Sequence, residues 1–214
     1  APFASGATGA AVMIGAGLYH REFVEAAQPG IWQVLCSTGT GVTLMSAQVD
    51  VKAVRAPIFD EATEPDPQKS GRLIEVPSCA SPVIVIRHAG LRDGTVATSF
   101  LGSAPLPSDL PLRLRLGAET YGLATKRDGK DAETVAVMLT AGDVSHAITR
   151  ISGCCNDTWP SVVWAGDLDR DGKLDLLLEL SAHYAGSQLT LFLSSAASGG
   201  DPVGEVARFE SGSC

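Results

Sequence analysis

Residues 161–180 read SVVWAGDLDRDGKLDLLLEL, and this stretch decides the fold that we expect for the chain. The apolar run 162–164 leads into an acidic turn that contains glycine, and a second apolar run, 174–180, leads out of it. Short apolar runs on either side of a turn predict two β-strands joined by a tight loop. The stretch therefore favours a β-rich fold in which this hairpin is well buried.

The turn inside this stretch has the residue spacing of a calcium-binding loop. Aspartates occupy its positions one, three, five and nine, and Gly172 at position six permits a sharp bend. Calcium takes about six to eight oxygen ligands, and acids packed this closely repel one another without a cation. We expect the ligands to be the side chains of Asp167, Asp169, Asp171 and Asp175 and the backbone carbonyl of Lys173. The alternative is an acidic, solvated turn.

The flanks of the loop separate it from the helix–loop–helix sites known as EF-hands. An EF-hand carries a bidentate Glu at the twelfth loop position, whereas Leu178 stands there in this chain. The DxDxDGxxD pattern, with residues 164–166 before it, resembles the loops of FG-GAP and VCBS-type repeats over about residues 161–195. That resemblance implies that calcium pins a turn between two strands. Those families build propellers from several copies, and we find one copy here.

The composition limits the classes of partner. The formal net charge of −8 argues against nucleic acid, because phosphate binding needs a basic face. The chain has no run of about 18 apolar residues, so we expect no membrane span. With 214 residues, the chain is long enough to bury a substantial core in one or two domains.

The rest of the sequence predicts a mainly β fold. Apolar and polar residues alternate along residues 47–53 and 110–116, and Gly and Pro punctuate the chain between such runs. We expect an antiparallel sandwich or a partly open barrel, either as one unit or as two β subdomains. The expected regions are an N-terminal arm with a short helix over 1–30, a β region over 31–103 and a second β region, with the calcium loop, over 108–214.

The cysteines and the N-terminus indicate an exported protein. The chain begins with Ala1-Pro2 and no Met, as a mature protein would after removal of a signal peptide. None of the cysteines has the spacing of a zinc site, so we expect disulfides in the periplasm or outside the cell. The expected pairs are Cys36 with Cys79, and either Cys154 or Cys155 with Cys214. The stretch from Trp164 to Leu193 also resembles the C-terminal part of exported bacterial proteins, a resemblance that implies no activity.

The chain offers no catalytic motif of a known kind, such as HExxH, GxSxG or a phosphate-binding GxxxxGK[ST] loop. Glu179, His183 and Tyr184 form the one group that we consider as a binding or acid–base surface, since histidine titrates near neutrality. The alternative is that Tyr184 packs under the hairpin and His183 caps a turn.

Three functions follow from these observations, in order of preference. The first is an exported, calcium-stabilised protein without enzyme activity that binds a protein partner. The second is a periplasmic inhibitor or immunity protein that neutralises a toxin or hydrolase and is steered by its acidic surface. The third is a calcium-assisted hydrolase, which needs an open coordination position near His183.

Overall fold

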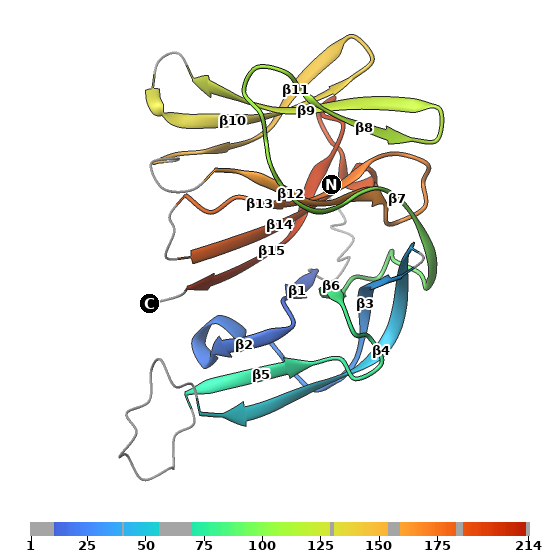
Figure 1. Ribbon diagram of the computed structural model, residues 1–214, viewed down its shortest axis with the longest axis vertical. Helices are drawn as coiled ribbons and strands as arrows, with labels where there is room; N and C mark the ends of the chain where they lie inside the picture. Colours follow the sequence, from blue (N-terminus) through green and yellow to red (C-terminus); the bar gives the residue numbers. More distant parts are fainter. Residues whose placement is uncertain are drawn as a thin grey trace, which may run out of the picture.

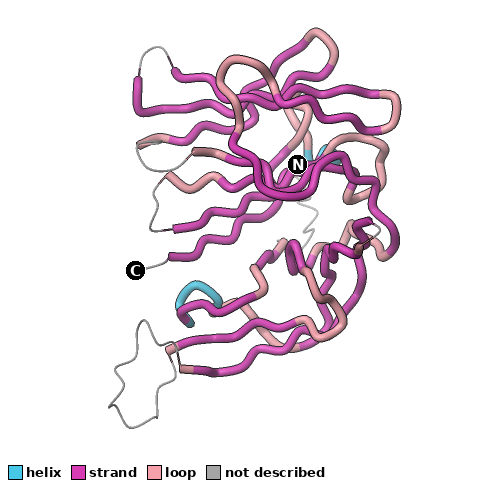
Figure 2. The backbone as a smooth tube through the Cα atoms, in the orientation of Figure 1, coloured by secondary structure: helices cyan, strands magenta, loops and turns pink. Residues whose placement is uncertain are grey.

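The protein is built almost entirely from β-strands. The computed structural model describes residues 11–39, 41–55, 70–128, 131–153, 159–182 and 186–212. Figure 2 shows that strands make up most of this part and that the helical segments are two short turns. The elements are β1 (Val12–Ile14), β2 (Gly17–His20), η1 (Arg21–Val24), β3 (Gly30–Thr38), β4 (Gly41–Val54), β5 (Gly71–Glu75), β6 (Pro82–Arg87), β7 (Gly94–Pro105), β8 (Leu112–Leu116), β9 (Glu119–Asp128), β10 (Asp131–Ala141), β11 (Val144–Ile151), β12 (Ser161–Asp167), β13 (Asp175–Glu179), β14 (Gly186–Leu193), η2 (Ser194–Ala196) and β15 (Gly204–Gly212).

These strands form two antiparallel sheets. The larger sheet has the order β1-β6-β3-β4-β7-β12-β13-β14-β15, and β5 and β2 branch from β4. Its two end strands, β1 and β15, lie beside each other, so this sheet is nearly closed like a barrel. The smaller sheet has the order β11-β10-β9-β8 and lies over β12 to β15, on the side away from β1 to β6 (Figure 1). The expected mainly β fold is confirmed.

Strands β12 to β14 are buried on both faces, which explains the consecutive apolar residues, such as 162–164 and 176–178, that the sequence shows there. Successive side chains of a strand point to opposite faces of its sheet. Leu177 packs in the core shared with β1 to β6, whereas Leu176 and Leu178 pack in the core under β8 to β11. Trp164 packs in the first of these cores and Phe192 in the second, and they are 0% and 2% exposed. A strand covered on both faces needs apolar residues at consecutive positions rather than at alternate ones.

The short helix expected within residues 1–30 is reduced to a single 3-10 turn that follows a short strand. Gly17–His20 forms β2, which pairs with β5, and only the four residues Arg21–Val24 form a 3-10 helix. The aromatic ring of Tyr19 contacts Phe209 of β15 edge-on, with 5.1 Å between the ring centroids. Residues 17–20 are thus held in extended form by pairing with β5 and by the contact of Tyr19 with β15.

The long strand β7 joins the two expected β regions. Its first residues pair with β4, from Val42 to Leu44, and its later residues pair with β12. The gap between the two expected regions, residues 104–107, is entered by this strand, which continues as far as Pro105. The division of the chain into separate regions over 31–103 and 108–214 stays a prediction.

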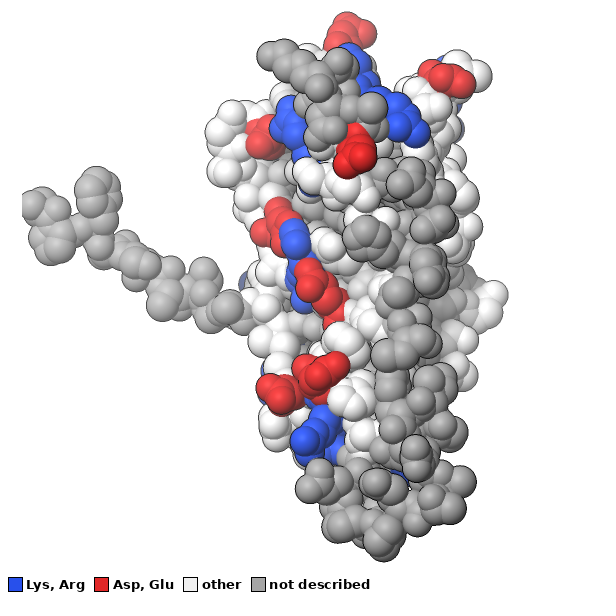
Figure 3. Space-filling view, turned by 90° about the vertical axis from the view of Figure 1, so that its left-hand side faces the viewer, with Lys and Arg blue, Asp and Glu red and all other residues white. Residues whose placement is uncertain are grey.

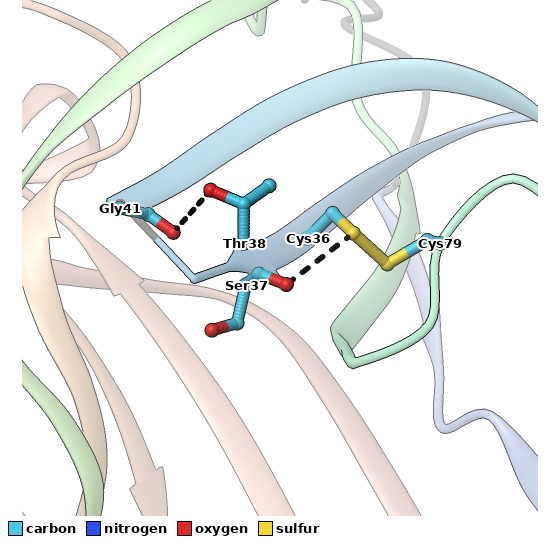
Figure 4. The surroundings of a disulfide bond; sticks show 5 residues. All are labelled: Cys36, Ser37, Thr38, Gly41 and Cys79. Atoms are coloured by element: carbon cyan, nitrogen blue, oxygen red, sulfur yellow. Dashed lines mark hydrogen bonds between the residues drawn. A yellow bond between two sulfur atoms is a disulfide. The ribbon is translucent and has the colours of Figure 1, made fainter.

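A disulfide joins Cys36 and Cys79, the first of the two pairs that the sequence suggested (Figure 4). Cys36 lies in β3 and Cys79 in the connection between β5 and β6, and both are buried, at 4% and 5% exposure. Beside the bond, the hydroxyl of Thr38 donates a hydrogen bond to the carbonyl of Gly41 where β3 turns into β4. Residues 154–158 and 213–214, which hold the other three cysteines, lie outside the described part of the chain.

Candidate metal site

The acidic loop connects β12 and β13, two neighbouring strands of the layer that is buried on both faces. Asp167 is the last residue of β12 and Asp175 is the first residue of β13. Leu168 and Leu174, just inside the two ends of the loop, are buried in opposite cores. Arg170 has a φ of 64° and Gly172 a φ of 83°, so the backbone between these anchors turns through the left-handed region. The cores thus fix both ends of the loop and the positive φ angles curl its tip.

Three of the expected ligands come together. Asp167, Asp169 and Asp175 each offer a carboxylate oxygen, and these oxygens lie within 4.8 Å of one another. Asp171 lies outside this group. Its carboxylate accepts hydrogen bonds from the Lys173 amide, at 2.8 Å, and from a serine hydroxyl of η2. The structure therefore contains a carboxylate triad that can hold a metal ion, with Asp171 and Lys173 at its exposed side.

The carboxylates also organise the loop backbone. The amide of Gly172 donates a hydrogen bond to Asp167 at 3.0 Å, and the amide of Asp171 donates one to Asp169 at 3.3 Å. Aspartate side chains that bond backbone amides further along the chain stabilise tight turns in this way. Because the amides hold the carboxylates on the inside of the curl, the oxygens of the triad face one another.

Asp175 is the most buried acid of the protein's described part, at 0% exposure. One of its oxygens accepts a hydrogen bond from the Leu168 amide at 2.6 Å, and the other accepts one from the Ser194 amide at 2.8 Å. Burial nevertheless raises the pKa of Asp175 from 3.8 to about 7, and the nearby charge of Asp169 adds to the rise. In the metal-free protein the cost of removing this charge from water thus outweighs the hydrogen bonds.

Asp167 provides a test of whether a cation suits the site. Its Oδ1 atom is buried and has no hydrogen-bond partner among the described residues. Burial raises the pKa of Asp167, and the charges of Asp171 and Asp169 raise it further, against the lowering effect of the Gly172 amide. A cation would supply the missing partner and offset the repulsion, so these residues fit a hard, oxygen-binding metal ion.

The structure adds three residues that the loop spacing does not reveal. Ser194 and Ser195 of η2 donate hydroxyl hydrogen bonds to the loop carboxylates. Burial raises the pKa of the Tyr121 hydroxyl on β9, with smaller contributions from the nearby acids, and a hydrogen bond between this hydroxyl and the backbone of Leu174 acts in the opposite direction. These residues come from segments well separated from the loop in sequence, and no local pattern marks them. The site is therefore assembled from both sheets.

The second candidate group lies at the other end of β13. Glu179 ends this strand and accepts hydrogen bonds from the amides of Ser181 and Gln188, at 3.0 and 2.7 Å, and from the hydroxyl of Ser187. These bonds close the turn between β13 and β14, so the carboxylate of Glu179 has a structural task. His183 and Tyr184, the other residues of this group, lie outside the described part of the chain.

Comparison of the chain with models of known protein families, with curated proteins and with solved structures found no match. Within the described ranges, no helix has the length and the apolar character needed to cross a membrane.

Replacing Gly166 by alanine is expected to destabilise the strand that leads into the loop. A Cβ atom at this position would overlap the carbonyl oxygen of Ala97 in β7 and the indole of Trp164. Overpacking of this kind costs about 1–3 kcal/mol. Gly41→Ala is the matched control, because a Cβ there meets nothing within 4 Å. Equal free energies of unfolding for the two variants in urea would contradict the close packing at Gly166.

Proposed function

We propose that this chain is an exported, calcium-stabilised protein without enzyme activity that binds a protein partner. The observation that carries the calcium assignment is the triad of Asp167, Asp169 and Asp175 on a strand–loop–strand turn, with a buried oxygen that lacks a partner. All of these donors are oxygens, as hard cations prefer. Calcium suits the site better than magnesium, because calcium accepts flexible geometry and many carboxylates whereas magnesium keeps several of its waters.

The task of the ion in this proposal is structural. It would neutralise the carboxylates between β12 and β13 and so hold the central layer of the fold in one arrangement. Two further features support a location in the periplasm or outside the cell. The Cys36–Cys79 disulfide suits an oxidising compartment. A loop that binds calcium, as proposed here, suits a compartment in which calcium is abundant.

The surface charges bear on the kind of protein partner. On the face shown in Figure 3, acidic and basic side chains lie close together along the length of the molecule. Among the ion pairs of the described residues, Arg208 of β15 contacts Glu205 at 2.9 Å and Glu210 at 3.6 Å. This face therefore offers paired charges, which favour a partner recognised by shape and hydrogen bonds over one attracted by a single sign of charge.

Calcium is expected to raise the melting temperature of the wild-type protein above its value in EDTA, and magnesium is expected to have a smaller effect. Calcium at about 100 times its dissociation constant stabilises the folded state by about 2.7 kcal/mol. Asp167→Ala removes a member of the triad and should abolish this stabilisation, whereas Asp171→Ala, outside the triad, should only weaken it. The measurement is a thermal melt of each variant in EDTA, calcium and magnesium.

The control for these variants is Asp143→Ala, which removes an exposed acid from the turn between β10 and β11. It should keep the full calcium response. If Asp167→Ala retains the wild-type rise in melting temperature, the loop does not bind the ion and the proposed function fails.

A further inference from the structure

Two adjacent serines that lie outside the acidic loop contact most of its carboxylates. The hydroxyl of Ser194 lies 2.9 Å from Asp171 Oδ2 and 3.0 Å from Asp175 Oδ1, and the hydroxyl of Ser195 donates a hydrogen bond to Asp169 Oδ2. Both serines belong to η2, which follows β14 directly. One two-residue segment thus contacts the carboxylates at positions three, five and nine of the loop.

These serines begin the connection between β14 and β15, residues 194–203. The connection folds back on itself, because a Cβ atom on Gly204 would overlap the carbonyl of Ala196. Its far part reaches the smaller sheet: Asp201 lies 3.9 Å from His146 Nδ1 on β11, and Val203 is buried in the core beneath that sheet. The connection therefore links the acidic loop to β11 and to the start of β15.

The hydroxyl contacts make the connection sensitive to the charge state of the loop. A serine hydroxyl has one hydrogen, so Ser194 donates to Asp171 or to Asp175 but not to both at once. Without a cation, the carboxylates repel one another and Asp167 Oδ1 has no hydrogen-bond partner among the described residues. A bound cation would fix the carboxylate positions, and each carboxylate has enough lone pairs to bind the metal and accept a serine hydrogen bond together.

We infer that Ser194 and Ser195 are positioning residues that couple cation binding in the loop to the order of the β14–β15 connection. This inference rests on the proposed calcium binding and specifies what the ion controls. Binding at the loop restrains residues 194–203 through the two hydroxyls, and the restraint reaches β11 and β15. Calcium thus regulates a surface segment that is separate from the loop in sequence.

Hydrogen–deuterium exchange of the full chain, in EDTA and in calcium, tests the coupling. The readout is the exchange of amides 195–203, which include the hydrogen-bonded amides of Ala197 and Asp201. In the wild-type protein we expect calcium to slow their exchange by about fivefold or more, the lower end of typical coupling between sites. In the double variant Ser194→Ala with Ser195→Ala this effect should be lost, while calcium still slows exchange in the loop.

Three single variants sharpen the test. Ser195 is exposed, so Ser195→Ala leaves the core intact and serves even if the double variant does not fold. It should reduce the calcium effect on the connection, and Ser195→Thr, which keeps a hydroxyl, should restore it. Ser198→Ala removes an exposed serine of the same connection and should behave as the wild type.

The outcomes separate the inference from the proposed function. If calcium slows exchange in the loop but not in the connection of the wild-type protein, the coupling is wrong and calcium binding stands. If the connection responds fully in the double variant and in Ser195→Ala, the serines do not carry the coupling. If neither the loop nor the connection responds to calcium, both the inference and the proposed function are wrong.

Discussion

Calcium is expected to stabilise the protein strongly at about pH 8 and very little at about pH 5, because it binds Asp175 only in the charged form. The metal-free protein keeps a proton on this buried carboxyl up to about pH 7, whereas the unfolded chain releases it near pH 3.8. The proton bound in the folded state contributes stability that is complete below the lower value and is lost as the pH rises through the higher one. Across this range the contribution of this one carboxyl falls by on the order of 4 kcal/mol.

The measurement is a series of thermal or urea melts between these pH values, each in EDTA and in calcium. At each pH, the stability measured in EDTA is subtracted from the stability measured in calcium. This subtraction removes the contributions of groups whose titration calcium does not affect. Asp143→Ala should follow the wild-type protein, since its turn lies outside the acidic loop. A calcium effect of the same size at every pH would mean that Asp175 is charged in the metal-free protein, and would contradict the role of its burial.

Loss of the Cys36–Cys79 disulfide is expected to have an effect of similar size. The bond closes a loop with a sequence separation of 43 residues, for which the loss of chain entropy in the unfolded state gives about 4 kcal/mol. In a chain of this length, that change lowers the melting temperature by roughly 10 °C. Melts of the double variant Cys36→Ala with Cys79→Ala, compared with the wild type, measure the effect directly.

Treatment with a reducing agent distinguishes the effect of this disulfide from the effects of the other cysteines of the chain. The wild-type protein should melt at a lower temperature after prolonged reduction. The reduction itself should be slow, because both cysteines are buried. The double variant should show no corresponding change. If reduction lowers the melting temperature of the double variant as much as that of the wild type, the stabilising bond lies elsewhere in the chain.

The sequence was sufficient where the signal was local. The run from Leu174 to Leu180 predicted a deeply buried strand, and the structure explains the run by a core on each face. The alternation at residues 112–116 also gave a half-buried strand, with Leu114 buried and Arg113 exposed. The spacing of the acids predicted four carboxylate ligands, and the structure brings three of them together, with Asp171 outside the group. Strand period and loop spacing are properties of neighbouring residues, and for that reason they can be read without a structure.

The sequence was insufficient where distant segments decide the outcome. Asp93-Gly94 has the composition of a hairpin turn, yet Asp93 accepts hydrogen bonds from Ser46 of β4, and the strand that follows pairs with β4 and β12. Leu110 was assigned to the same face as Leu114 but is 81% exposed, because β8 begins only at Leu112. The serines of η2 contact the acidic loop through a fold-level arrangement that no spacing in the loop encodes.

The order in which the chain is synthesised matters for this architecture. The strands that separate the two cores, β12 to β15, come from the last third of the sequence. Until a translating or translocating chain delivers them, β3, β4 and β6 leave a broad apolar face without its cover, and the smaller sheet is in the same position. Such partly folded chains are prone to aggregate. We therefore expect the two cores to be completed only after residues 161–212 have been synthesised.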